Sequence, residues 1–407
     1  MLRLVCLFLI QSDETDYYCN NNPAGPLTEP LRQRICPRVL DDETDDSALL
    51  SPWSFPPACV RSNNTLAESS KLCTYTTSNF RGEHGMSIVT KPVIAAGLST
   101  MLQHPEIPWL EKQRGFPFLA DERDLYEIKS LPGKGFGVVA KSEIPKDTVI
   151  MLELPYVVKI SKSTPWDHQG GALGLMRQAA KQLPQRDQDR LLRMARQEKG
   201  YILTDIFQTN SFSISVEGVP HAALYPVIAR VNHECRPNCI TRFSSQTLAM
   251  EVVAHRDIQP GEEITISYIP LNMQSQQRLQ KIQSWGFNCS CSFCADERKL
   301  AESDRRRDGI EAIIHGLRQP INMSREIVSL AITRLEEMAE EEGLSSQMGD
   351  ILYLVADACL SADNFQLARE VGEKALKIQK RYAGVDNERS YDVMRLLEIV
   401  GALEHRT

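Results

Sequence analysis

The 407-residue sequence has no long uncharged apolar run. No segment reaches the roughly 18 apolar residues that a membrane-spanning helix needs. Hydrophobic residues make up 42% of the chain and charged residues 24%, which is ordinary for a globular protein. We therefore expect a soluble chain with no membrane span, and its length predicts two or three domains of roughly 100–200 residues each.

The chain also lacks an excess of basic residues. The chain has 46 Lys and Arg against 53 Asp and Glu, a net charge of −7. Apart from "RRR" at 305–307 the basic residues are scattered, and short basic runs usually mark a solvated loop or helix end. This balance argues against direct binding of a nucleic-acid backbone and fits a basic peptide partner. We expect a monomer.

Cysteine occurs in two groups with different surroundings. Cys19, Cys36, Cys59 and Cys73 lie in a polar, Pro-rich leader that begins "MLRLVCLFLIQS". A positive residue before an apolar run of about 7 residues is typical of a short signal peptide, after which four cysteines would suit two disulfides in an oxidising compartment. The alternative is that "MLRLVCLFLI" is a buried strand or a gene-model artefact.

The pattern of strands and helices predicts an α+β chain. Turn-rich, β-branched sequence indicates a mainly-β domain, and uniformly helical spacing indicates an all-α C-terminal domain. The expected segments are a loop-rich extension at 1–72, a linking region at 73–124, the β domain at 125–270 with a helical insert at about 168–200, a Cys-rich segment at 271–296, and the helical domain at 305–407.

Apolar stripes at 325–342, 348–360 and 365–382 predict three helices of the C-terminal domain. Asp363 or Asn364 is the expected N-cap of the third, and Gly384 its stop. Small-residue pairs in "NFQLAREVGEKALKIQ" suit tetratricopeptide-like hairpins, but an ordinary helical bundle explains the same periodicity.

Two distant stretches indicate a metal site. "FNCSCSFC" at 287–294 holds three clustered cysteines, one thiolate short of a closed structural zinc site. Within "RVNHECRPNC" at 230–239, Cys235 or Cys239 can supply the fourth ligand if the two stretches meet in the fold. Disulfide pairing is the alternative.

Five motifs occur in a familiar order. They are "GKGFG" at 133–137, "TNSFSI" at 209–214, "ALYPVIARVNHECRPNC" at 223–239, "GEEITISYIPL" at 261–271 and "FNCSCSFC" at 287–294. Singly they are weak, because "GKGFG" alone suits any tight hairpin turn. Together they resemble the SET-domain protein lysine methyltransferases, particularly the SMYD-like branch and its fungal relatives. The MYND finger that SMYD proteins carry within the SET region is missing.

The resemblance implies a knotted, mainly-β SET domain after a pre-SET region, followed by a post-SET zinc segment. It implies S-adenosylmethionine as cofactor and one structural zinc ion. The implied zinc ligands are Cys235, Cys289, Cys291 and Cys294. The implied cofactor-binding residues are Lys134, Gly135, Phe136, Asn210, Asn232, His233, Tyr268 and Phe287.

Tyr268 matches the family's catalytic tyrosine. Methyl transfer needs a neutral lysine amine, whose ordinary pKa is about 10.4, and a nearby sulfonium and a desolvating channel both lower that value. The resemblance implies that Tyr268 orients this amine and that the substrate is a protein with a basic, lysine-containing segment, with histones as candidates. Glu234 departs from the family, which usually has a serine between the His and Cys.

Two other functions fit the same residues. A non-catalytic scaffold would capture a peptide with its helical region, and a methyltransferase could act on a small amine instead of a protein. The compartment is open as well. A secretory leader conflicts with zinc thiolates and a cytosolic cofactor, which favour a nuclear or cytoplasmic protein.

Overall fold

The computed structural model describes residues 51–61, 71–82, 84–103, 125–161, 171–318 and 324–404. The candidate signal peptide, Cys19 and Cys36 lie outside these residues. The chain folds into two compact units, and neither is continuous in sequence. The first unit combines Met1–Ile107 with Pro155–Pro226, and the second combines Pro108–Leu154 with Val227–Thr407.

This division differs from the contiguous segments expected from the sequence, because the β region at 125–270 contributes to both units. The reason is a parallel pairing in the first unit. Strand β3 (His84–Thr90) pairs with β7 (Val157–Ile160), so the chain returns to the early strands after leaving them. The strands also begin before Cys73, with β1 at Ala58–Arg61.

The first unit is built on one six-stranded sheet. Its strand order is β1-β2-β3-β7-β9-β8, and all neighbours except β3 and β7 are antiparallel. The remaining elements are β2 (Lys71–Phe80), β8 (Phe212–Val216), β9 (Val219–Leu224), α3 (Pro92–Gln103), α7 (Gly171–Gln182), α8 (Gln185–Leu192) and α9 (Ile202–Asn210). The predicted helical insert corresponds to α7 and α8.

Buried hydroxyl groups attach helix α7 to this sheet. Thr74 on β2 donates to the Leu175 carbonyl at 3.0 Å, and Ser87 on β3 donates to the Ala179 carbonyl at 2.8 Å. Polar groups can be buried there because each finds a partner. Cys59 and Cys73 face each other across β1 and β2 and form a disulfide.

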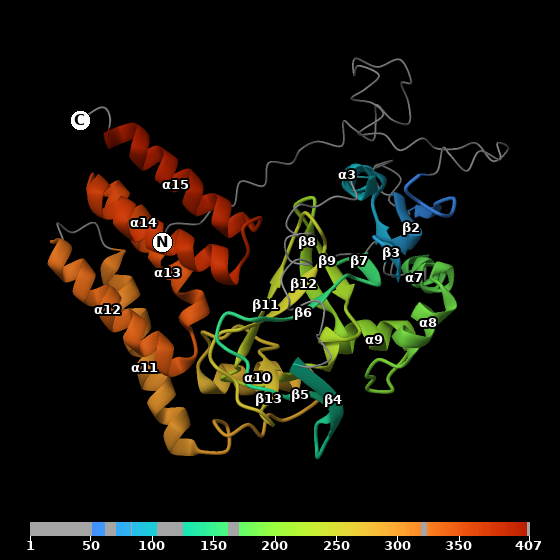
Figure 1. The fold of residues 1–407 in the computed structure, drawn as a ribbon, viewed down its shortest axis with the longest axis horizontal. Coiled ribbons are helices and arrows are strands. Elements are labelled where there is room, and N and C mark those ends of the chain that lie inside the picture. Colours follow the sequence, from blue (N-terminus) through green and yellow to red (C-terminus); the bar gives the residue numbers. More distant parts are fainter. Residues whose placement is uncertain are drawn as a thin grey trace. The chain divides into compact units, whose positions relative to one another are not determined.

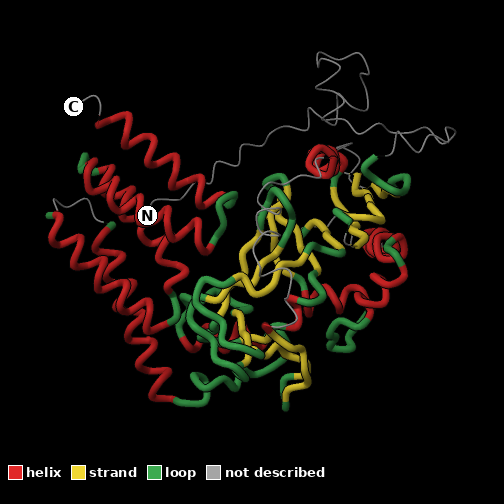
Figure 2. Tube along the Cα trace, in the orientation of Figure 1, coloured by secondary structure: helices red, strands yellow, loops and turns green. Residues whose placement is uncertain are grey.

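The second unit begins with two smaller sheets. One has the order β10-β13-β5-β4 and the other β11-β12-β6, and long loops join their short strands (Figure 2). The elements are β4 (Tyr126–Leu131), β5 (Gly135–Ala140), β6 (Val149–Glu153), η3 (Ile228–Arg230), β10 (Asn232–His233), β11 (Cys239–Phe243), β12 (Met250–Ala254) and β13 (Glu263–Ile266).

Helices complete the second unit, and α11 to α15 run side by side (Figure 1). Their apolar faces form a core that includes Val328, Leu352 and Val393, none of which is exposed. The helical elements are α10 (Ser275–Gln283), α11 (Glu297–Leu317), α12 (Arg325–Glu342), η4 (Ser345–Gln347), α13 (Met348–Ser361), α14 (Phe365–Tyr382) and α15 (Glu388–Glu404). The expected combination of sheets and a helical C-terminal region is confirmed.

The predicted helix boundaries agree closely with the structure. Asn364, one of the two candidate caps, accepts a hydrogen bond from the Leu367 N–H at the start of α14. Gly384 lies after the end of α14 with φ of 107°. The charged stretch at 295–309 is largely helical, because α11 begins at Glu297, so the helices start before residue 305.

A buried charge cluster joins α11 to α12. The Arg307 guanidinium lies 3.1 Å from the Glu342 carboxylate, and Ser303 donates to the same carboxylate at 2.5 Å. Glu342 is 1% exposed and Arg307 is 5% exposed. Burial lowers the pKa of Arg307 to about 10. In the described part of the chain, no helix has the length and apolar character needed to cross a membrane.

Candidate functional site

The turn between β4 and β5 presents a lysine and an aromatic ring. The Lys134 N–H donates to the Leu131 carbonyl at 3.2 Å, which closes the turn. Gly133 and Gly135 both have φ of 73°, a left-handed conformation that glycine adopts without steric cost. Phe136 is 58% exposed at this position. The "GKGFG" stretch therefore needs its first two glycines for the turn itself.

Glu263 lies between two of the residues implied by the resemblance. One carboxylate oxygen accepts a hydrogen bond from the Asn232 side-chain amide at 2.9 Å, and the other accepts one from the Lys134 ammonium at 2.6 Å. A Cβ atom on Gly137 would lie 2.7 Å from the Asn232 Nδ2, so the glycine lets the backbone approach this group. Glu263 is not among the site residues expected from the sequence, although it lies in the motif "GEEITISYIPL".

Strands β10 and β13 bring His233 and Tyr268 together. The two strands pair in parallel, and the Tyr268 N–H donates to His233 Nδ1 at 3.1 Å. Because a backbone N–H can only donate, Nδ1 accepts, and a neutral ring carries its proton on Nε2. That nitrogen lies 3.5 Å from the Cys235 sulfur. His233 therefore connects the strand before Tyr268 to the cysteine group.

The Tyr268 side chain is held in a fixed position. Its hydroxyl donates to the Val231 carbonyl oxygen at 2.8 Å. Burial, and to a smaller extent the charge of Glu263, raise the pKa of this hydroxyl above its ordinary value. Tyr268 is therefore a neutral phenol whose proton is engaged, and its oxygen lone pairs are left to accept a hydrogen bond.

Aromatic rings surround Tyr268. The Trp285 ring centroid lies 5.0 Å from that of Tyr268, and the Phe287 centroid lies 6.4 Å from it. Phe287 also lies 6.2 Å from His233 and is 39% exposed. Trp285 is not among the site residues expected from the sequence. Its position two residues before Phe287 was the sequence feature that could have indicated a place in the site.

The four cysteines implied as zinc ligands form one group. The sulfur atoms of Cys235, Cys289, Cys291 and Cys294 all lie within 4.8 Å of one another, and none is in a disulfide. The Cys235 sulfur lies 3.7 Å from that of Cys289 and 3.4 Å from that of Cys294. A tetrahedral zinc ion with Zn–S bonds of about 2.3 Å separates its sulfur ligands by about 3.8 Å. The donor set and its spacing therefore fit zinc.

Hydrogen bonds among these thiols change their acidity. The Cys235 thiol is the main cause that lowers the pKa of Cys289 and of Cys291, the latter to about 5. The Cys289 thiol is in turn the main cause that raises the pKa of Cys235. Cys289 and Cys291 thus favour the thiolate, the form that binds metal, whereas the raised pKa of Cys235 and of Cys294 keeps these two thiols neutral.

Cys239 and Asn210 have other surroundings. Cys239, weighed as the alternative fourth ligand, lies on β11, is fully buried and is outside the four-cysteine group. Asn210 belongs to the first unit. Its side-chain amide donates to the Ala195 carbonyl at 2.8 Å and to the Ile206 carbonyl at 2.7 Å, which fixes the end of α9.

The residues around Glu263 fit S-adenosylmethionine. The carboxylate of Glu263 suits a positively charged ligand, and the Lys134 ammonium suits a carboxylate. The exposed rings of Phe136 and Phe287 offer flat apolar surface for an adenine ring. The Arg230 guanidinium lies 5.6 Å from the Phe136 ring centroid and holds that ring from one side.

Comparison with known proteins identifies the class. Residues 135–269 match the family model of the SET domain. The chain is 27% identical to the histone-lysine N-methyltransferase set5 of Schizosaccharomyces pombe over 285 residues, which cover 68% of this chain and 85% of set5. The chain thus contains a SET domain at residues 135–269.

The SMYD proteins are further relatives. Human N-lysine methyltransferase SMYD2 is 29% identical over 189 residues, 41% of this chain and 43% of SMYD2. Human histone-lysine N-methyltransferase SMYD3 is 36% identical over 96 residues, 23% of this chain and 22% of SMYD3. The chain spans less than half the length of these two relatives. Its resemblance to the SMYD-like SET-domain lysine methyltransferases is confirmed.

Proposed function

We infer that this protein transfers methyl groups from S-adenosylmethionine to lysine side chains of proteins. The observation that carries this inference is the meeting of Lys134, from the turn before β5, with Asn232 on β10 and Glu263 on β13. Strand β13 leads to Tyr268, and residues 135–269 match the SET domain. The names of set5, SMYD2 and SMYD3, which are all lysine methyltransferases, support the same activity.

The cofactor is held by residues of this second unit. Asn232 and Glu263 bind its ammonium group, and Lys134, together with main-chain groups of Gly135 and Phe136, binds its carboxylate. Phe287 stacks on the adenine, and the main chain of His233 bonds to its edge. When bound, S-adenosylmethionine supplies an electrophilic methyl group. A cofactor role of Asn210 rests on the family resemblance alone, since its side-chain amide donates to the Ala195 and Ile206 carbonyls within the first unit.

Tyr268 acts on the substrate amine. The lysine must be neutral to react, and the desolvating rings of Trp285 and Phe287 disfavour its charged form. Since the Tyr268 hydroxyl already donates to Val231, it receives a hydrogen bond from the amine rather than giving one. This leaves the nitrogen lone pair free and fixes its direction, so pre-alignment supplies much of the rate enhancement.

A structural zinc ion is proposed in the four-cysteine group. The metal ties Cys235, which follows the Asn-His pair, to the segment of Cys289, Cys291 and Cys294. That connection holds Phe287 beside His233, and it closes the cofactor site as a post-SET segment does. Four thiolate ligands leave no open coordination position for chemistry. The knotted arrangement of a SET core is part of the same proposal.

A groove beside Tyr268 is the proposed seat of the protein substrate. Its volume is about 360 Å³, and its lining includes Ser267 and Ile269, the two neighbours of Tyr268, together with Tyr382 and Arg389 from the helical region. A peptide bound there has its lysine close to the tyrosine. The net charge of −7 supports a basic segment as substrate, with histones among the candidates.

Radiolabelled methyl transfer tests this proposal. The full chain is incubated with labelled S-adenosylmethionine and with either core histones or protein extract, and protein and small-molecule fractions are counted separately. We expect label in protein. Label confined to small molecules would establish a small-amine methyltransferase instead. If calorimetric titration detects no binding of S-adenosylhomocysteine, the enzyme proposal fails and the scaffold function replaces it.

A further inference from the structure

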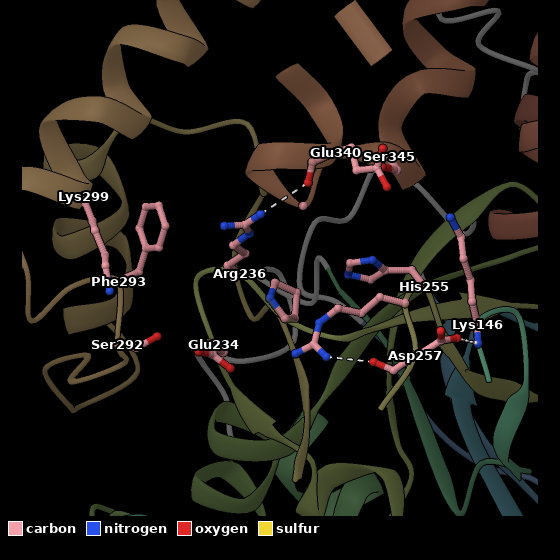
Figure 3. Close-up of a pocket in the computed structure, with 13 residues that line it drawn as sticks. Lys146, Glu234, Arg236, His255, Asp257, Ser292, Phe293, Lys299, Glu340 and Ser345 are labelled. Atoms are coloured by element: carbon pink, nitrogen blue, oxygen red, sulfur yellow. Dashed lines mark hydrogen bonds between the residues drawn. The ribbon is translucent and has the colours of Figure 1, made fainter. Parts of the chain in front are cut away.

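A second cavity of about 600 Å³ lies in the second unit (Figure 3). It shares Pro237 with the groove next to Tyr268 and is otherwise lined by different residues. Its walls come from the loop after Cys235, the turn after β12, the segment after Cys291 and the end of α12. The proposed methyl transfer uses none of the cationic groups that line it, which are Lys146, Arg236, His255, Arg256 and Lys299.

His255 is the most unusual group of this cavity. Its side chain is 7% exposed, and its Nε2 has no hydrogen-bond partner in the described part of the chain. Burial lowers the pKa of the imidazole. The hydrogen bond of the other ring nitrogen to the Pro237 backbone raises that pKa, but by less. A buried polar atom without a partner costs free energy. The Nε2 atom has already lost its hydration, so a ligand that donates a hydrogen bond to its lone pair gains that bond without a further desolvation cost on the histidine.

Arg236 offers unused donors to the same space. Its guanidinium makes only a 3.4 Å contact with the Glu340 carbonyl oxygen and forms no ion pair among the described residues. The side chain reaches this place because Gly343, with φ of 70°, ends α12 without a side chain. A Cβ there would lie 3.1 Å from the Arg236 Cγ.

Two lysines approach from other segments. Lys146 makes no ion pair within the described ranges, and Lys299 has only Asp296 at 3.9 Å. The charges of Arg256 and Lys146 both act on the His255 ring, which places them near it. Arg256 is neutralised by its ion pair with Glu262. Lys146 and Arg236 are therefore cationic donors of this cavity that form no ion pair among the described residues, and they flank His255 in Figure 3.

Carboxylates also line the cavity, so its total charge is nearly balanced. Glu234, Asp257 and Glu340 are present, and Asp257 accepts a hydrogen bond from the Lys146 backbone N–H at 2.7 Å. An anion is thus selected by individual donors around His255 rather than by a general positive field. Such a site requires an anion with several acceptor oxygens and one shared proton.

We propose that this cavity binds a small phosphorylated anion through Arg236, His255 and Lys146. A phosphoryl group presents oxygen atoms to the arginine and lysine donors, and its P–OH form donates to the His255 lone pair. The ligand is either free phosphate or the phosphate of a small molecule, for which the cavity has room. This site is independent of the proposed methyl transfer.

Calorimetric titration of the full chain at low salt tests the site, with inorganic phosphate and pyrophosphate as probes and sodium chloride at matched ionic strength as background. We expect saturable binding of one anion per chain. Tighter binding of pyrophosphate indicates a ligand with linked phosphates, and equal binding indicates a single phosphoryl group. Arg236→Gln and Lys146→Gln, both at exposed positions, should each weaken binding about tenfold or more.

Arg334→Gln is the matched control, because Arg334 lies on the surface of α12 and its one ion pair among the described residues is with Glu337. It should leave phosphate binding unchanged. His255→Gln should weaken binding as well, and the two surface variants decide the matter if that buried variant folds poorly. Absence of saturable binding to the wild type, or equal weakening by Arg334→Gln, would overturn the proposal.

Discussion

The Tyr268 hydroxyl and the Val231 carbonyl oxygen are joined by a 2.8 Å hydrogen bond. This bond spans the parallel pair of β10 and β13, so the proposed catalytic tyrosine is positioned by the residue directly before Asn232. The proposed cofactor-binding and lysine-binding residues therefore share one pair of strands. Their separate roles can be distinguished because Tyr268 contacts neither Glu263 nor Asn232 through its hydroxyl.

Tyr268→Phe should reduce turnover while leaving cofactor affinity near the wild-type value. The variant loses a hydrogen bond from the amine, which gains positive charge as the methyl group is transferred. Such a bond to a charged group is worth about 1.5–3 kcal/mol, or roughly 10- to 150-fold in rate. The radiolabel assay measures the rate and calorimetry with S-adenosylhomocysteine measures the affinity. Tyr391→Phe, at an exposed position on α15, is the control. Methyl transfer by Tyr268→Phe at the wild-type rate would remove Tyr268 from the mechanism.

Asn232→Ala should instead weaken cofactor binding. It removes one hydrogen-bonding group from the cofactor site and one partner from Glu263, a loss of about 1–3 kcal/mol, or roughly 5- to 150-fold in the dissociation constant. Titration with S-adenosylhomocysteine measures the change. Gln366→Ala removes an exposed amide from α14 and should bind as the wild type does. An unchanged affinity in Asn232→Ala would exclude this residue from the cofactor site.

One zinc ion per chain is expected, and two serine variants test its ligands. Cys235→Ser should lose the metal, because Cys235 lies within the four-cysteine group. Cys239→Ser should keep it, because this buried thiol lies on β11 outside that group. Elemental analysis of both purified variants gives the answer. Loss of zinc from Cys239→Ser with retention in Cys235→Ser would mean that the ligand assignment is wrong.

Glu342→Ala should destabilise the helical region strongly. Arg307 would keep its buried charge without a carboxylate partner, which costs about 3–5 kcal/mol. Glu341→Ala is the matched control, since the neighbouring Glu341 side chain is 60% exposed and its loss should change the free energy of unfolding by less than about 0.5 kcal/mol. Urea denaturation compares the two. Similar values for both variants would show that the Arg307 charge is solvated.

His221 should make stability fall in acid. Burial lowers its pKa below the ordinary 6.5, and its Nε2 lies 2.8 Å from the Thr90 hydroxyl. The unfolded chain therefore takes up the proton first, so the free energy of unfolding decreases as the pH drops below about 6.5, by at most about 1.4 kcal/mol per pH unit. Urea titrations at several pH values measure this slope.

The His221→Gln variant isolates that contribution from other acid-sensitive groups. Its slope between the ordinary pKa and lower pH should be smaller than that of the wild type, whatever its absolute stability. His315→Gln, at an exposed position near the end of α11, should keep the wild-type slope. Identical slopes in all three proteins would show that His221 accepts a proton as easily in the folded chain as in the unfolded one.

Local features of this protein were readable from the sequence by itself. The helices α12, α13 and α14 end within about a residue of their predicted limits, and Asn364 caps α14, because periodicity and capping depend on neighbours a few residues apart. The five motifs predicted the SET domain for a similar reason. Each motif is a short run of neighbouring residues, and the order of the five runs can be read directly from the sequence.

Only the tertiary structure decided which distant residues meet. Whether Cys235 or Cys239 joins the other three cysteines depends on the path of the loop between β10 and β11. Cys235 lies in that loop and Cys239 begins β11. The contact of Asn232 with Glu263 requires the pairing of β10 with β13, and the proximity of Trp285 to Tyr268 requires the turn after α10. These contacts join segments far apart in the chain, and no local pattern encodes which segments come together.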